Sequence, residues 1–175
     1  VIIMGTGHQP TPMVLAGKAL ADITRFIKGD RYRSRLISKI MFGAYNKRIK
    51  NVRTSNDWLT RDETVVDEYN AGKLTTFLFT VNGYRGLMNM ILYVRKPRNI
   101  AKIPKNLPML MVSGLDDPVG EYGKGVYRAY NTYHGHIDDI DLRLFEDCRH
   151  ELCNELNKEE IYEEIYGWIV DHMNK

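Results

Sequence analysis

The fold of this protein is decided by the stretch Met109-Leu110-Met111-Val112-Ser113-Gly114-Leu115-Asp116-Asp117-Pro118. Its first four residues form a short apolar run that ends at Ser113-Gly114, which is typical of a buried strand entering a turn. Two carboxylates and a proline follow directly. Buried parallel strands are unbroken apolar runs, and open parallel sheets bind ligands beyond the carboxyl ends of their strands. The stretch therefore predicts a parallel strand with functional carboxylates at its end.

Two further segments have the pattern of strands. Val1–Met4 is an apolar run that stops at Gly5-Thr6-Gly7, which predicts a buried strand, and Asp141–Phe145 alternates polar and apolar residues. Helical patterns follow the second and third strands, at Gly120–Tyr133 and Glu159–Met173. Strands that alternate with helices through short connections predict an α/β fold with a parallel sheet. Because a buried strand needs neighbours on both sides, a chain that starts within one is expected to be a fragment.

The ninety or so residues that follow the first strand have mostly helical patterns. We expect Thr60 to cap one helix there, with Glu63 completing a capping box. Another helix is expected over Leu74–Tyr93, whose wide apolar face fits ordinary core or the roof of a pocket. The expected helices are Met13–Phe26, Leu36–Ala44, the one that carries Val65, Val66 and Tyr69, and Leu74–Tyr93, before a linker with Pro97, Pro104 and Pro108.

Composition narrows the class of protein. The 175 residues are 43% hydrophobic and 27% charged, as in ordinary globular domains, and the net charge is +3. Segment 18–53 holds 11 basic residues against two acidic ones, which fits a solvated helical face or a nucleic-acid surface. We favour the solvated face and expect no nucleic-acid partner, because no recognised binding motif accompanies these charges.

Hydropathy and cysteine content indicate the compartment. No apolar run approaches the roughly 20 residues that a membrane helix needs, so we expect no transmembrane segment. Cys148 and Cys153 are too few for a disulfide framework or a zinc site, which fits a reducing compartment. We therefore expect a cytoplasmic protein with neither metal nor cofactor.

The candidate chemistry follows two of the predicted strands. Asp117 comes after the second strand, and His150 comes after the third in Arg149-His150-Glu151. Both residues are expected at the same edge of the sheet. A carboxylate that holds a histidine in one tautomer makes half of a nucleophilic relay, because the free imidazole nitrogen then accepts a proton.

Five motifs, in order along the chain, resemble the α/β-hydrolase superfamily, and most of all its lysophospholipase and monoacylglycerol-lipase-like branch (serine aminopeptidase S33). They are Gly5-Thr6-Gly7-His8-Gln9-Pro10, Tyr45-Asn46-Lys47, Asp57-Trp58-Leu59-Thr60-Arg61-Asp62, Ser113 to Gly120, and Arg149-His150-Glu151. The resemblance implies the C-terminal part of such an enzyme.

By position, the resemblance makes Asp117 the triad acid and His150 the general base. Asp116 competes for the role of acid, but the aspartate directly before Pro118 fits the family pattern better. The implied organisation is a core strand and turn at 1–8, a helical cap at 9–98 and a C-terminal α/β core at 99–175. Within the cap, the candidates for binding substrate are Trp58, Phe77 and Tyr84.

One family motif has no counterpart. The nucleophile elbow G-x-S-x-G does not occur in these 175 residues. The resemblance therefore implies a serine hydrolase of carboxylic esters, such as lysophospholipids or monoacylglycerols, whose serine lies in an N-terminal half of the same fold. This chain alone is expected to be inactive. The alternative is a non-catalytic interaction module or relic of the fold.

Overall fold

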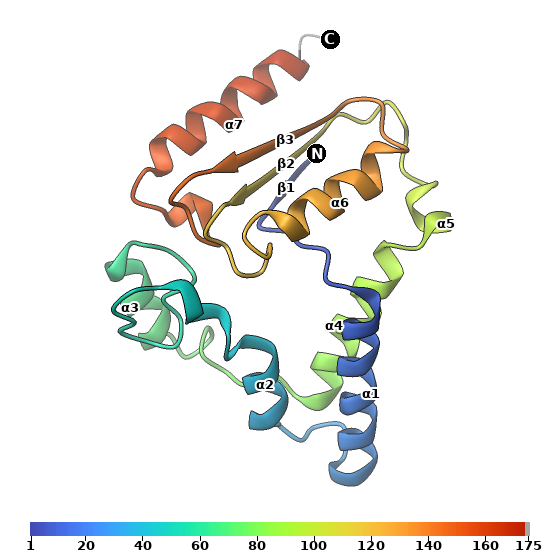
Figure 1. Ribbon diagram of the computed structural model, residues 1–175, viewed down its shortest axis with the longest axis vertical. Coiled ribbons are helices and arrows are strands. Elements are labelled where there is room, and N and C mark those ends of the chain that lie inside the picture. Colours follow the sequence, from blue (N-terminus) through green and yellow to red (C-terminus); the bar gives the residue numbers. More distant parts are fainter. Residues whose placement is uncertain (174–175) are drawn as a thin grey trace.

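The computed structural model describes residues 1–173, which form a parallel sheet, helices on both of its faces, and a separate helical layer (Figure 1). The strands are β1 (Ile2–Met4), β2 (Met109–Gly114) and β3 (Ile140–Phe145), in the order β1-β2-β3. Ile3 pairs with Met111, and Met111 pairs with Leu142, so all three strands run in register through the centre of β2. The predicted α/β fold with a parallel sheet is confirmed.

β2 is the centre of the core, and all six of its residues are buried. Successive side chains of a strand point to opposite faces, and each face of β2 is covered by one helix. Leu110 and Val112 share a cluster with Ile161 of α7 (Lys158–Met173). Met109 and Met111 share one with residues of α6 (Lys124–His134). The unbroken apolar run in the sequence is thus explained by burial on both faces.

The segment between β1 and β2 forms the helical layer, which lies on the side of the sheet where the strands end (Figure 1). α1 packs along α4, and a cluster of Ala21, Ile37, Val81 and Tyr84 joins α1, α2 and α4. No helix within residues 1–173 combines the length and apolarity needed to cross a bilayer. The helices of this layer are α1 (Thr11–Lys28), α2 (Arg35–Phe42), α3 (Glu63–Ala71), α4 (Val81–Val94) and the one-turn α5 (Pro97–Ile100), with a short 3-10 turn at Tyr45–Arg48. A second 3-10 turn, Leu152–Asn154, follows β3.

Two predicted helix starts in this layer are wrong. Asp62, not Thr60, caps α3, because its carboxylate accepts hydrogen bonds from the N–H groups of Thr64 and Val65. The Thr60 hydroxyl instead donates to the Asn154 carbonyl, a contact that no local pattern reveals. α4 begins only at Val81 after the Thr80 cap, so the expected helix over 74–80 is absent.

Two other expectations are also corrected. α6 begins at Lys124 rather than Gly120, because Glu121, Tyr122 and Gly123 all have positive φ and interrupt helical geometry. β1 is only partly buried, with Ile2 and Met4 each 36% exposed. Its neighbour among the described residues is β2 alone, so one edge of β1 has no strand beside it there.

Gly114, the last residue of β2, is where the loop after β3 comes closest to the sheet. A Cβ atom on Gly114 would lie 2.0 Å from the Cys148 carbonyl oxygen and 2.3 Å from that of Arg149. Both contacts are backbone atoms, so no side-chain rotation relieves them. Only glycine lets the loop that carries His150 lie directly against the end of β2.

We expect Gly114→Ala to lower the free energy of unfolding by about 3 kcal/mol, because the added methyl group forces the backbone apart. Gly135→Ala is the matched control, since its Cβ would meet nothing within 4 Å at an ordinary φ of −71°. That change is expected to stay within about 1 kcal/mol. Urea unfolding followed by circular dichroism measures both, and equal effects at the two glycines would contradict the close contact.

Candidate active site

The structure brings Asp117 and His150 together. Asp117 Oδ2 lies 3.1 Å from His150 Nδ1, and the aspartate is completely buried. The Val119 N–H donates to Asp117 Oδ1 at 2.8 Å, and the Ser113 hydroxyl donates to Oδ2 at 3.4 Å. Because an ionised carboxylate only accepts hydrogen bonds, this contact favours the His150 tautomer with its proton on Nδ1. Nε2 then has a free lone pair, and it makes no hydrogen bond within residues 1–173.

Asp116, the competing carboxylate, is placed differently. Its residue is exposed, and its backbone N–H donates to the Cys148 carbonyl at 2.9 Å. The turn that follows β2 thus buries Asp117 and leaves Asp116 exposed to solvent. Of the two, only Asp117 contacts the histidine.

The glycine turn after β1 reaches the same place. Gly5 has a φ of +63°, which favours glycine, and its N–H donates to the Val112 carbonyl at 2.9 Å. A Cβ atom there would lie 3.0 Å from Cε1 of His150. The ends of β1, β2 and β3 therefore converge on the imidazole, as expected for an open parallel sheet.

A chain of aromatic rings extends from His150 into the helical layer. The Trp58 ring centroid lies 5.2 Å from that of His150, Tyr45 lies 4.9 Å from Trp58, and Phe42 lies 5.6 Å from Tyr45. Burial, aided by the negative charge of Asp117, raises the pKa of Tyr45 to about 12. Tyr45 is thus a neutral phenol beside the pair. The sequence signalled it only as part of a motif, without a role.

A cavity of about 800 Å³ opens in the helical layer beside these rings, and its wall includes all three predicted substrate-binding residues. Phe77 is half exposed, whereas Tyr84 is only 1% exposed and backs the wall. Neither Asp117 nor His150 lines this cavity, so Trp58 is the residue that connects the two. Other residues of the wall include Arg35, Lys39, Phe42, Asn46, Asn70 and Phe79.

Asp57 holds the loop that presents Trp58. Its buried carboxylate accepts hydrogen bonds from the Arg53 N–H at 2.6 Å and from the Thr54 hydroxyl at 2.5 Å. Burial acts to raise the pKa of Asp57, but these hydrogen bonds favour the charged form and the net pKa is lowered. The charged carboxylate therefore stabilises this loop.

Removal of this charge, as in Asp57→Asn, is expected to cost about 2 kcal/mol of unfolding free energy at pH 7. Because folding lowers the pKa of Asp57, its contribution is full above the unfolded value of about 3.9 and is lost as the pH falls through the folded value. Urea unfolding from pH 7 to 3 should show the difference from wild type shrinking in acid.

The control for this experiment is Asp30→Asn, which removes an exposed ion pair with Arg25. Exposed pairs contribute roughly 0–1 kcal/mol, so its effect is expected to be small. A difference between Asp57→Asn and wild type that stays constant down to pH 3 would contradict the role of the charge.

One group of residues with the chemistry of metal ligands lies elsewhere. Ligand atoms of Asp139, Asp141 and His172 lie within 4.8 Å of one another, near the start of β3 and the end of α7. Asp141 accepts a hydrogen bond from the Trp168 indole, and His172 Nδ1 contacts the Trp168 carbonyl. No local pattern in the sequence marks this group, because its members lie on two distant segments.

Known structures share this fold. A carboxyl esterase from Bacillus coagulans in complex with glycerol superposes with a TM-score of 0.83 at 21% identity, over 99% of this chain and 55% of the esterase. A lipase in an open form gives 0.81 at 22% identity, over 98% of this chain and 56% of the lipase. A monoglyceride lipase variant from Saccharomyces cerevisiae gives 0.67 at 16% identity, over 98% and 55%.

The parallel sheet, the helical layer and these likenesses define the α/β-hydrolase fold. Residues 3–157 match the serine aminopeptidase S33 (hydrolase-4) family, so the chain belongs to this family. Among curated proteins, no relative matches. The chain spans little more than half the length of the similar solved structures.

Proposed function

We propose that this chain supplies the triad acid, Asp117, and the general base, His150, of a serine hydrolase that cleaves carboxylic esters. The observation that carries the proposal is the contact of 3.1 Å between Asp117 Oδ2 and His150 Nδ1. Membership of a hydrolase family and the order Asp before His along the chain support it. The buried Asp117 holds the tautomer whose Nε2 accepts a proton.

The proposed mechanism follows from this geometry. His150 Nε2 takes the proton of a serine hydroxyl as the serine oxygen attacks the ester carbonyl carbon, and Asp117 stabilises the imidazolium. The tetrahedral intermediate collapses when His150 protonates the leaving alcohol, which leaves an acyl-serine. Water then repeats the sequence, and the carboxylic acid is released.

The serine and the oxyanion donors are proposed to come from a segment N-terminal to this chain. Two facts support this: the 175 residues contain no G-x-S-x-G, and the chain spans about half of the similar structures. We further propose residues 1–8 and 99–175 as parts of the catalytic core and residues 9–98 as a cap. The last boundary falls within α5.

For the substrate we propose a lysophospholipid or monoacylglycerol-like ester. The aromatic cavity beside Trp58 supports a lipid chain, and its wall also holds amide and cationic side chains suited to a polar head group. Similar solved structures are described as a monoglyceride lipase and an esterase with glycerol.

The test is made on the protein that joins this chain to its upstream segment. Asp117→Asn is expected to lower kcat for a p-nitrophenyl ester about 10⁴-fold, because the histidine loses its tautomer. Asp116→Asn, an isosteric change at the neighbouring exposed residue, is expected to leave kcat unchanged. Equal losses of kcat in the two variants, or no loss in Asp117→Asn, would contradict the assignment of Asp117 as the triad acid.

The upstream coding DNA decides where the nucleophile lies. An in-frame segment that encodes G-x-S-x-G before the Val1 codon supports a serine hydrolase with this chain as its C-terminal part. A genuine start codon at that point would overturn the catalytic proposal and favour a relic or interaction module.

The cavity makes a separate prediction about substrate length. Phe77→Ala should raise KM for long-chain acyl esters by about tenfold and leave KM for the acetyl ester unchanged, because it removes apolar surface from the wall. Phe26→Ala is the control, since Phe26 is 92% exposed and lies outside the cavity. An equal change in KM for the two esters, or no change for either, would contradict binding of the acyl chain in this cavity.

A further inference from the structure

The loop that carries His150 is fastened to the helical layer on both sides of the histidine. Before it, the Arg149 guanidinium donates to the Asp57 carbonyl at 2.6 Å and to the Thr60 carbonyl at 2.9 Å. After it, the Glu151 N–H donates to the Leu59 carbonyl at 2.7 Å. The base is therefore supported by residues 57–61 as well as by the sheet.

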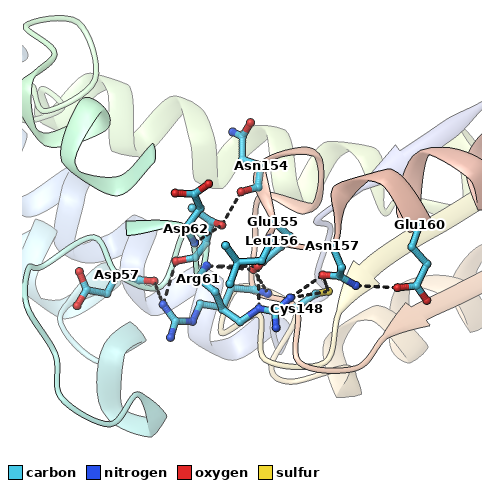
Figure 2. Close-up of polar contacts among 11 residues, drawn as sticks. Asp57, Arg61, Asp62, Cys148, Asn154, Glu155, Leu156, Asn157 and Glu160 are labelled. Atoms are coloured by element: carbon cyan, nitrogen blue, oxygen red, sulfur yellow. Dashed lines mark hydrogen bonds and ion pairs between the residues drawn. The ribbon is translucent and has the colours of Figure 1, made fainter. Parts of the chain in front are cut away.

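A buried carboxylate completes this attachment. The Glu155 side chain is fully buried and accepts hydrogen bonds from the Arg149 N–H at 2.7 Å and from Arg61 Nε at 2.8 Å. The backbone N–H of Arg61 also faces this carboxylate, at 3.3 Å from both oxygens. Figure 2 shows Arg61 lying between the helical layer and Glu155. One carboxylate thus joins the residue before His150 to residue 61 of the other layer.

A second guanidinium nitrogen of Arg61, Nη2, also has a partner. Its NH2 group donates to Asn157 Oδ1 at 2.5 Å, and Asn157 in turn donates to Glu160 at 3.0 Å (Figure 2). The Thr60 hydroxyl donates to the Asn154 carbonyl at 2.7 Å. Glu155 and Asn157 thereby bind two nitrogens of the Arg61 guanidinium, which fixes the direction of this side chain.

The ion pair between Arg61 and Glu155 differs in its energetics from an ordinary stabilising contact. A buried ion pair contributes little net stability, because desolvation offsets the attraction, but removing one partner leaves an uncompensated charge. A buried ion pair of this kind favours one arrangement of the groups around it. Here that arrangement includes Trp58, which lies in the attached segment and packs against the His150 ring.

We propose that Arg61 and Glu155 are positioning residues, which hold the backbone at Arg149 so that His150 Nδ1 meets Asp117. The inference rests on the proposed function and deepens it. Residues 57–61, although part of the proposed cap, belong to the support of the general base. Neither Arg61 nor Glu155 touches the reacting atoms.

The test uses the full enzyme with a short acetyl ester, which does not need the acyl pocket. Arg61→Met and Glu155→Gln are expected to lower kcat by about 10²-fold while KM changes less than threefold, because a displaced base costs reaction rate rather than binding. The pH profile of kcat/KM should also differ from that of the wild type, since the contact between His150 and Asp117 is altered. Arg61→Lys, which keeps the charge, should restore part of kcat.

Arg53→Met is the matched control. Arg53 lies in the same layer and pairs with Asp67 and Glu63, but these partners are exposed, and its side chain makes no hydrogen bond or ion pair with Glu155 or with residues 148–151. Its removal is expected to leave kcat, KM and the pH profile unchanged. Thermal unfolding of every variant checks that the compared proteins are folded.

The outcomes separate the two proposals. Full activity in His150→Ala would overturn the proposed function itself. An inactive His150→Ala together with folded Arg61→Met and Glu155→Gln of unchanged kcat and pH profile would overturn only the positioning role, as would a rise in KM alone. If the uncompensated charge prevents folding of Arg61→Met, the folded Arg61→Lys decides by the same two readouts.

Discussion

The contact between the end of β2 and the loop after β3 is the constraint on which the candidate site depends. Gly114 has no side chain, so the carbonyls of Cys148 and Arg149 lie where a Cβ atom would be. This approach brings His150 over the turn that carries Asp117, and the two meet at 3.1 Å. The parallel register of β2 and β3, with Gly114 opposite Phe145, places both turns at one edge. Asp117 and His150 are neighbours because the two strands end together.

The histidine loop is then closed from the other side by the helical layer. Residues 57–61 form hydrogen bonds with the loop that carries His150, and the buried Glu155 carboxylate joins Arg61 to the backbone of Arg149. The same segment presents Trp58 to the imidazole and to the cavity. One short stretch of chain therefore supports His150 and forms part of the cavity wall. In the proposed function, substrate recognition and placement of the general base share these structural elements.

Much of this arrangement could be predicted. Two apolar runs and one alternating segment identified the strands, since each has the length and pattern of a strand in a sheet. The positions of Asp117 and His150 after two of these strands placed them at one edge. Helix boundaries were less predictable: Asp62 and Thr80 are caps, whereas Thr60 is used in a contact with Asn154, 94 residues away. A threonine that caps a helix and one that bonds a distant carbonyl look alike in sequence.

By itself, then, the sequence determined the α/β class, the order of the elements and the pair of residues that carries the candidate chemistry. These depend on local hydrophobic periodicity and on the rule that parallel strands end at one edge. Only the tertiary structure decided that Asp117 is buried against His150, that Tyr45 packs on Trp58 beside these two residues, and that Glu155 joins Arg61 to the backbone of Arg149. Those features depend on contacts between residues far apart in the chain, where burial and hydrogen-bond geometry, not local pattern, select the partner.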